Sequence, residues 1–373
     1  MSAWGTAYGM WCSDVTDVKI APRAPGEPGD LRKEELAAWL STLPPFKGSK
    51  DRPGSVSLCA LNGDASFRRY FRVGGYIAVD SPPDTQKNAE FVDVSRRLRQ
   101  VGLRVPHIFA CDLDKGFMLL EDLGNLLFAS RALGSEQPRF YDKAAALLPS
   151  LVKADSQGLP PFDRDFILME LGICSEWYLG KKLRLTLSAQ EQELIAKSFN
   201  LLADLITAQP QAAMHRDFHC RNLMVLQDES LAVIDYQDMV RGPLTYDLAS
   251  LLFDCYRVLP QDIVDSLTEI TWRRFAALGL LSAGENAETV VSLSEFTRMV
   301  RVVSLQRHIK VLGIFSRLSL RDGRDGYLAD LPRVFDYVIA ECAALPEFKD
   351  LGEFFKNRAA LSSAASCAAS EGR

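Results

Sequence analysis

The sequence predicts an α+β protein of two lobes, with a small β-rich N-lobe and a larger, mainly helical C-lobe. Its 373 residues can bury a large core, and typical domain sizes suggest two packed lobes. Between residues 56 and 121, short apolar runs alternate with glycine-containing turns, a pattern typical of antiparallel strands. From residue 125 onward, apolar residues recur at spacings of three and four, which indicates helices.

Composition and charge limit the class of protein. Hydrophobic residues make up 47% of the chain and charged residues 24%, as in ordinary globular proteins. The net charge of −5 provides no basic surface for nucleic acid, and no apolar run reaches the roughly 18 residues of a membrane span. The N-terminus lacks the pattern of a secretory signal, and the eight cysteines lack the spacing of a zinc site or disulfide framework. We expect a cytoplasmic protein with reduced thiols and no nucleic-acid or membrane partner.

The lobes are predicted from breaks in the pattern along the chain. A mobile extension rich in glycine and proline is expected over residues 1–30, followed by the N-lobe over 31–124, the C-lobe over 125–360 and a frayed tail over 361–373. Within the N-lobe, leucine spacing from Leu31 predicts a helix that ends before two prolines. Strands joined by short turns are predicted over residues 67–73, 76–79, 106–111 and 117–121.

A second N-lobe helix is predicted to begin at Glu90. Its apolar positions include Val94, Leu98 and Val101, which places Glu90 on the same inward-facing stripe. A buried carboxylate needs a partner, so we expect Glu90 to pair with a cation. Capping of the helix N-terminus is the alternative role for this residue.

The C-lobe is predicted to be built from long amphipathic helices. Apolar periodicity indicates helices over residues 140–153, 188–209 and 290–320. The last of these carries basic residues on more than one face, most of which we expect to be solvated or salt-bridged. Among them, we expect the QRHIK segment around Arg307 to approach an acidic sugar substituent or a phosphate. Glu170, Glu176, Trp177 and Tyr178 are residue types suited either to binding a sugar ring or to packing two helices.

The stretch from residue 215 to residue 235 carries the chemistry. Two apolar runs, 223–226 and 231–234, flank a polar turn and predict a β-hairpin. Asn222 precedes the first strand and Asp235 follows the second, so antiparallel pairing brings them to the same end. Asp217 lies in the loop that leads into the hairpin. Asn222 and Asp235 can therefore bind Mg²⁺, which prefers oxygen ligands, while Asp217 accepts a proton from a hydroxyl group.

The motif HRDFHCRN, followed by IDYQD and GPLTYDLA, resembles the aminoglycoside/choline phosphotransferase family, which has the protein-kinase-like fold. Within it, GDASFRRYFRV, DSPP, EWYLG and QRHIKVLGIFSRL resemble bacterial kinases that act on the anomeric hydroxyl of amino sugars. The resemblance covers residues 31–345. It implies an ATP- and Mg²⁺-dependent kinase that converts N-acetylmuramate or N-acetylglucosamine to the α-1-phosphate in peptidoglycan recycling.

The resemblance also assigns roles to individual residues. It implies that Asp217 is the catalytic base, that Asn222 and Asp235 bind the metal, and that His215 and Asp247 support the catalytic loop; Asp247 also stands at an expected helix N-cap. Nucleotide-binding residues are expected at Ser66, Phe67, Arg68, Glu90, Glu121 and Leu123. Substrate-binding residues are expected at His219, Arg221, Glu176, Tyr178 and Arg307.

One residue of the kinase pattern is missing. The third strand carries no lysine for the ATP phosphates, so Arg68, Arg72 or Lys87 replaces it, or metal ions and backbone groups suffice.

Two other functions stay open. A kinase of another small acceptor, such as an aminoglycoside or an amino alcohol, is one alternative. A nucleotide-binding scaffold without turnover is the other. An activation segment ending in Ala-Pro-Glu is not found after Asp235, which disfavours a protein kinase.

Overall fold

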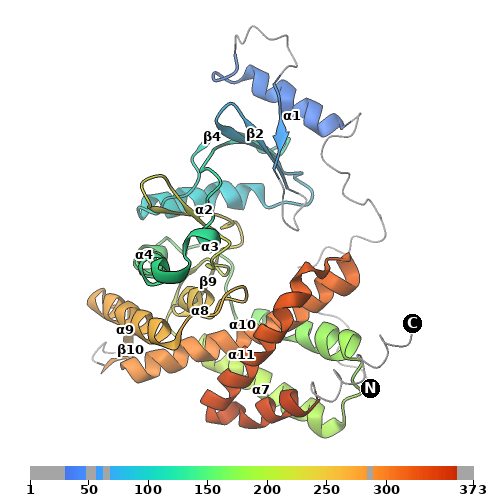
Figure 1. Ribbon diagram of the computed structural model, residues 1–373, viewed down its shortest axis with the longest axis vertical. Helices are drawn as coiled ribbons and strands as arrows, with labels where there is room; N and C mark the ends of the chain where they lie inside the picture. Colours follow the sequence, from blue (N-terminus) through green and yellow to red (C-terminus); the bar gives the residue numbers. More distant parts are fainter. Residues whose placement is uncertain (1–29, 48–55, 62–67, 284–288, 359–373) are drawn as a thin grey trace. The chain divides into compact units, whose positions relative to one another are not determined.

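Alternating apolar residues fold the N-terminal part of the chain into an antiparallel sheet, as predicted. The computed structural model describes residues 30–47, 56–61, 68–283 and 289–358; the predicted tail and all of the predicted extension before Asp30 lie outside them. The sheet has the strand order β1-β2-β3-β5-β4, with every neighbouring pair antiparallel (Figure 1). Its strands are β1 (Cys59–Ala60), β2 (Arg69–Val73), β3 (Tyr76–Asp80), β4 (Ile108–Asp112) and β5 (Phe117–Glu121).

The Gly74-Gly75 turn sets the register of the central hairpin. Both glycines have positive φ, 52° and 82°, which a two-residue turn of the primed type requires and which glycine adopts without strain. Strands β2 and β3 therefore pair from Val73 opposite Tyr76 to Arg69 opposite Asp80. The predicted hairpin is confirmed.

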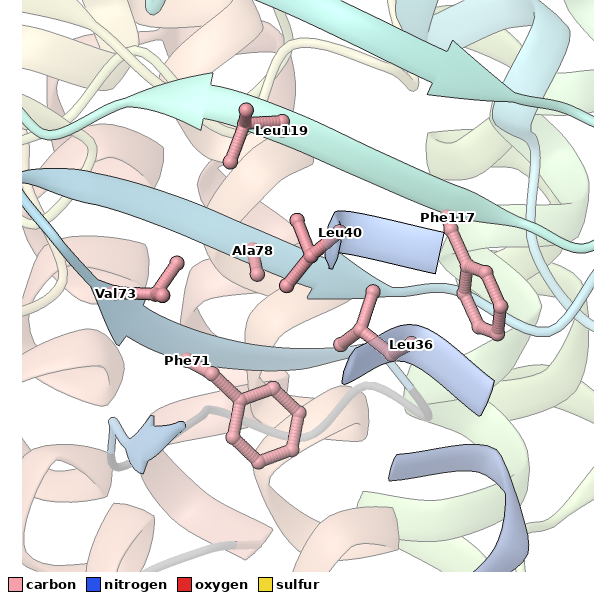
Figure 2. Packing of buried hydrophobic residues seen from close by; sticks show 7 residues of the cluster. All are labelled: Leu36, Leu40, Phe71, Val73, Ala78, Phe117 and Leu119. Atoms are coloured by element: carbon pink, nitrogen blue, oxygen red, sulfur yellow. The ribbon is translucent and has the colours of Figure 1, made fainter. Parts of the chain in front are cut away.

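Helix α1 (Leu31–Thr42) covers the core of this sheet. Its leucines Leu36 and Leu40, four residues apart, are fully buried, and Figure 2 shows them beside side chains from β2, β3 and β5. On β2 the alternate residues Phe71 and Val73 belong to the same cluster, because side chains two apart share a face of a strand. The remaining members are Ala78, Phe117 and Leu119.

The described chain divides into two compact units. The division differs from the predicted lobes in the placement of one helix, α2. The first unit holds the described residues up to Asn88 together with His107–Asp122, and the second holds Ala89–Pro106 and the described residues from Leu123 onward. The break after Asp122 lies close to the boundary predicted at Gly124. Helix α2 (Asn88–Gln100), predicted to belong to the N-lobe, is grouped with the second unit.

Contacts within the second unit explain the grouping of α2. The ring of Phe91 stacks on Tyr236 with a centroid separation of 4.9 Å. The guanidinium of Arg97 donates to the carbonyl oxygens of Asp155 and Gln157 at 2.8 and 2.7 Å. Glu90, by contrast, is exposed, so the prediction that it lies on the buried stripe is wrong. The stripe runs through Phe91, Val94 and Leu98 instead, one residue out of phase with Glu90.

The second unit is mainly helical, as predicted. Its longest helix, α10 (Leu293–Asp322), is drawn in orange in Figure 1 and packs against η2 (Cys174–Lys182), α11 (Leu331–Ala344), α6 (Arg164–Ile173) and α8 (Tyr246–Leu252). The other helices are α3 (Phe128–Arg131), η1 (Gly134–Glu136), α4 (Gln137–Ala145), α5 (Leu148–Leu151), α7 (Ala189–Thr207), α9 (Gln261–Ala277), η3 (Asp325–Asp330) and η4 (Pro346–Phe348). Among the described residues, none of these helices meets the length and apolarity that a membrane crossing demands.

Three short antiparallel pairs complete the second unit. Strand β6 (Gln211–Met214) pairs with β9 (Val240–Pro243), and β7 (Leu223–Val225) pairs with β8 (Leu231–Val233). A further pair joins β10 (Ser282–Ala283) to β11 (Thr289–Val290). Because β6 ends at Met214, it delivers the chain directly into the loop that begins at His215. Strand β9 ends at Pro243, opposite Gln211 at the start of β6, and α8 begins three residues later.

Helix α10 approaches α6 and η2 at Gly313. A Cβ atom at this residue would lie 2.5 Å from the amide nitrogen of Cys174 and 2.5 Å from the carbonyl carbon of Ile173. We expect Gly313→Ala to lower the free energy of unfolding by about 1–3 kcal/mol, as overpacking does, measured by urea denaturation. The control is Gly172→Ala, whose Cβ would meet nothing within 4 Å and which should hold or raise stability through helix propensity. Equal stability of Gly313→Ala and the wild type would contradict the close approach.

Candidate active site

The side chains of Asn222 and Asp235 meet at the open end of the β7–β8 hairpin, beside the backbone of Asp217. The pairing of Leu223 with Val233 places Asn222 and Asp235 side by side. The Asn222 amide nitrogen donates to the backbone carbonyl of Asp217 at 3.0 Å and lies 3.4 Å from the Oδ2 atom of Asp235. The predicted meeting of Asn222 and Asp235 is confirmed, beside the backbone of Asp217; the convergence of the Asp217 side chain with them stays a prediction.

The donor set at this end of the hairpin fits a hard cation. Because the amide nitrogen of Asn222 is used by Asp217, its amide oxygen is the atom left for a metal ion. Asp235 is exposed and adopts a left-handed backbone conformation with φ 64°, which is uncommon for a residue other than glycine and recurs at functional sites. One amide and one carboxylate leave room for the phosphate and water oxygens that Mg²⁺ normally keeps. No cluster of three or more His, Cys, Asp or Glu that could hold a metal occurs among the described residues.

The carboxylate of Asp217 lies in a positively charged environment. Burial alone would raise its pKa, but the nearby charges of Lys310, His219, Arg307 and Arg216 outweigh burial and hold the pKa well below the ordinary range. Asp217 is therefore ionised at neutral pH. An ionised carboxylate can orient a hydroxyl group and accept its proton as the oxygen forms a new bond.

Asp247 holds the first part of the catalytic loop. Its carboxylate accepts the backbone N–H groups of His215 and Arg216 at 2.7 and 3.0 Å. The N-cap residue of α8 is Thr245, and Asp247 lies inside the first turn, so the prediction that Asp247 is an N-cap is wrong. Its oxygens serve amides of the loop instead of amides of its own helix.

The His215 side chain joins the loop to the hairpin. Its Nε2 atom lies 3.1 Å from the carbonyl oxygen of Ile234, and its Nδ1 atom accepts the backbone N–H of Asp217 at 3.3 Å. With Nδ1 as the acceptor, the imidazole is in the tautomer that donates from Nε2 to Ile234. The imidazole links residues on both sides of the site, which fits the structural support expected of it.

Asp254, which the sequence reasoning missed, holds the other end of the loop. This fully buried carboxylate accepts the backbone N–H of Cys220 at 2.9 Å and that of Tyr256 at 2.8 Å. Burial, with Asp254 nearby, raises the pKa of the Cys220 thiol, so this cysteine is an inert packing residue. Asp247 in the first turn of α8 and Asp254 just after the helix thus fix the two ends of the catalytic loop. A lone aspartate after an apolar run gave no signal of this role.

His219 and Arg221 meet at Tyr256. The His219 ring packs edge-to-face on Tyr256 with a centroid separation of 5.3 Å, and burial lowers the pKa of His219. The guanidinium of Arg221 lies 3.5 Å from the centre of the same ring, a cation–π contact. Arg221 is exposed and adjacent to Asn222. Its contact with a substrate stays a prediction.

The structure separates the other residues expected to bind substrate. Glu176 is exposed and forms an ion pair with Lys181 at 2.7 Å. Tyr178, two residues later in η2, is buried, with 7% of its surface exposed. Neither belongs to the hydrogen-bond network of the catalytic loop. Arg307 does: it is 2% exposed, donates to the carbonyl oxygen of Arg216 at 2.7 Å and lies over the ring of Tyr246.

The basic residues in the middle of α10 are buried, and the expectation that most of the helix's basic residues are solvated or salt-bridged holds through ion pairs such as His308 with Glu341 and Lys310 with Glu170. Arg307, His308 and Lys310 are 2%, 0% and 5% exposed. Burial lowers the pKa of His308, but Glu341, 3.0 Å from its Nδ1 atom, outweighs burial and raises that pKa to about 10. Every residue from Val302 to Gly313 is buried, so this part of α10 is enclosed on all its faces. Its polar and charged residues carry no sequence pattern that indicates such burial.

Glu170 is the second residue that the sequence reasoning did not place in the site. It is 3% exposed and forms an ion pair with Arg216 at 2.7 Å. The amide of Gln306 donates to its other oxygen at 2.9 Å. Glu170 follows the apolar run 166–169 in α6, and no feature of the sequence distinguished it from Glu176 in η2.

The residues expected to bind nucleotide are placed on both units. Arg68 is buried, and its Nε atom donates to the Ser81 hydroxyl at 3.0 Å. The Glu121 carboxylate accepts the backbone N–H of His107 at 3.2 Å. Glu121 and Leu123 stand on either side of the break between the units. Ser66 and Phe67 lie outside the described residues, and the nucleotide-binding roles stay predictions.

The candidates to replace the missing lysine also have structural roles. Strand β3 carries no lysine. Arg72 forms a bidentate ion pair with Asp122 at 2.5 and 3.0 Å, and Arg68 contacts Ser81 as described above. Lys87 precedes α2. Both arginines are therefore positioned by neighbours in their own unit.

Comparisons with known proteins place these features in a family. The family model described as "Phosphotransferase enzyme family" matches residues 57–281. The N-acetylmuramate/N-acetylglucosamine kinase of Pseudomonas aeruginosa is 33% identical over 332 residues, which cover 87% of this chain and 96% of that protein. The protein of the same name from Neisseria meningitidis serogroup B is 35% identical over 318 residues, covering 82% and 90%.

Solved structures share the fold at low sequence identity. A choline/ethanolamine kinase family protein from Mesorhizobium loti has a TM-score of 0.59 and 16% identity, covering 87% of this chain and 99% of its own. The ADP-bound aminoglycoside phosphotransferase APH(2'')-Ib has a TM-score of 0.53 and 15% identity, covering 81% and 97%. These similarities establish the kinase-like fold. The match of the family model over most of the chain, together with the identity to full-length relatives, shows that the chain belongs to the phosphotransferase enzyme family.

Proposed function

We propose that this chain is an ATP- and Mg²⁺-dependent kinase of the C1 hydroxyl of N-acetylmuramate and N-acetylglucosamine. The observation that supports this acceptor is the identity of 33% to the P. aeruginosa kinase across 96% of that protein's length. The product is the α-1-phosphate, and the proposed setting is cytoplasmic recycling of cell-wall sugars. A small-molecule sugar is the proposed partner.

The proposed chemistry assigns one task to each side chain at the hairpin. Asp217, ionised at neutral pH, accepts the hydrogen bond of the C1 hydroxyl and takes its proton as the oxygen attacks the γ-phosphorus of ATP. The bond between the γ-phosphorus and the bridging oxygen breaks, and ADP leaves. Asn222 and Asp235 would hold Mg²⁺, which when bound neutralises charge on the phosphate oxygens. Asp247 and Asp254 keep the loop from moving while the acceptor is held in line.

Incubation with ATP and a panel of acceptors tests the proposal. The panel holds N-acetylmuramate, N-acetylglucosamine, choline and an aminoglycoside, and ³¹P NMR detects the anomeric phosphate through its coupling to the C1 proton. The matched control is the methyl glycoside of N-acetylglucosamine, which has no free C1 hydroxyl. We expect both N-acetylated sugars to be phosphorylated and the methyl glycoside to be inert. Phosphorylation of the methyl glycoside, or of choline or the aminoglycoside alone, would contradict the proposal.

A further inference from the structure

The residue immediately before the proposed base has a strained backbone. Arg216 has φ 79°, in the left-handed region that side chains with a Cβ atom rarely adopt. Strain of this kind persists only where the surroundings hold the residue firmly. Because Asp217 follows directly, a change in the backbone of residue 216 would turn the Asp217 carboxylate away from its present direction.

Three side chains hold Arg216, one at each of its polar groups. The backbone N–H donates to Asp247 at 3.0 Å, and the backbone carbonyl accepts from Arg307 at 2.7 Å. The guanidinium donates to Glu170 at 2.7 Å and lies over the ring of Phe166. These holding residues come from α8, α10 and α6. Arg216 is thus constrained by three helices at once.

Glu170 is itself fixed by α10. Gln306 donates to one of its oxygens at 2.9 Å, and the ammonium of Lys310 lies 3.6 Å from the other. Burial would raise the pKa of Glu170, but Lys310 and Arg216 hold it below the ordinary value, so the carboxylate is charged and its pair with Arg216 is ionic. A buried ion pair is a costly way to gain stability but an effective way to fix a geometry.

We propose that Glu170 is a positioning residue for phosphoryl transfer, which acts by holding Arg216 in the left-handed conformation that directs Asp217 toward the acceptor. The proposal rests on the proposed function of Asp217. Both oxygens of the buried Glu170 carboxylate are occupied by Arg216, Gln306 and Lys310, so its effect on turnover passes through the backbone of residue 216. It should therefore change kcat while leaving KM for ATP and for the sugar nearly unchanged.

The first test compares two variants that both lose the ion pair. Arg216→Gly supplies a residue that adopts positive φ without strain, and Arg216→Ala supplies one that does not. Both variants lose the guanidinium beside Asp217, so both should fall below the wild type; we expect kcat of Arg216→Ala to lie below that of Arg216→Gly by about fivefold or more, given the preference of alanine for negative φ. Equal kcat values for the two variants would overturn the proposal.

The second test is a double-mutant cycle. We expect Glu170→Gln to lower kcat by about 10-fold or more in the wild-type background and by less than about threefold in the Arg216→Gly background, because coupled residues show non-additive effects. The control is Glu269→Gln, which removes an exposed carboxylate paired with Arg273 on α9 and should leave kcat unchanged. The same loss from Glu170→Gln in both backgrounds, or no loss in either, would refute the positioning role of Glu170.

The tests separate this proposal from the proposed function and from loss of folding. Thermal melting of each variant is measured first; if Glu170→Gln does not fold, the comparison of Arg216→Gly with Arg216→Ala decides alone. Full activity of Asp217→Asn would overturn the proposed function of Asp217. Loss of activity in Asp217→Asn without the expected difference at residue 216 would overturn the role of Glu170 only.

Discussion

The Asp217→Asn variant is expected to lose about 10²–10⁴-fold in kcat, the range typical of a general base. The amide has the size of the carboxylate but cannot accept the proton of the acceptor hydroxyl. The surrounding cations, Lys310, Arg307 and Arg216, are left in place, and they hold the wild-type carboxylate ionised. The measurement is steady-state kinetics with ATP and N-acetylmuramate, together with the affinity for ATP, which should stay close to the wild-type value.

The control for this experiment is Asp165→Asn, which makes the same chemical change at an exposed residue of α6 and should leave kcat unchanged. Two outcomes would count against the base assignment. Undiminished turnover by Asp217→Asn would show that no proton is taken by this carboxylate. A loss explained entirely by weaker ATP binding would place Asp217 in nucleotide binding instead.

The Asp235→Asn variant should show the second large effect, in its dependence on Mg²⁺. Removing the charge from one of the two proposed metal ligands weakens the hold on a hard cation. We expect kcat to fall by about 10²–10³-fold, the range found when a group that stabilises transition-state charge is removed. Saturation should also require a higher concentration of Mg²⁺. The measurement is kcat across a Mg²⁺ titration at fixed ATP.

Asp228→Asn is the matched control for the metal ligand. Asp228 lies in the turn at the other end of the same hairpin, is exposed, and accepts the backbone N–H of Ser230 at 2.9 Å. This variant should keep the wild-type dependence on Mg²⁺. If Asp235→Asn titrated with Mg²⁺ in the same way as Asp228→Asn, Asp235 would not be a metal ligand.

The sequence was sufficient to predict those parts of the site that depend on local pattern. The hairpin follows from two apolar runs and a polar turn, and antiparallel pairing then requires Asn222 and Asp235 to meet. In the same way, Gly74-Gly75 between alternating runs predicted the β2–β3 hairpin. In each case the residues that determine the geometry lie within about twenty positions of one another, so local rules were enough.

Contacts between distant segments could not be predicted from the sequence. Glu170, Arg216 and Lys310 come from three elements that share no sequence pattern, and their pairing depends on how α6 and α10 cross at Gly313. The sequence also did not indicate which residues pair with His308 and Lys310, because their partners Glu341 and Glu170 lie on other elements. Glu90 was wrongly assigned to the buried face of α2. Positions three and four residues before Val94 lie close to the same helix face, and the structure buries Phe91 at the first and exposes Glu90 at the second.

A structure of the protein with a non-hydrolysable ATP analogue, Mg²⁺ and N-acetylmuramate tests the central claim most directly. The account predicts the C1 hydroxyl oxygen at about 2.6–3.2 Å from the Asp217 carboxylate, the reach of a general base, with the metal bound by Asn222 and Asp235. A sugar whose C1 hydroxyl points away from Asp217, or a metal bound elsewhere, would contradict it.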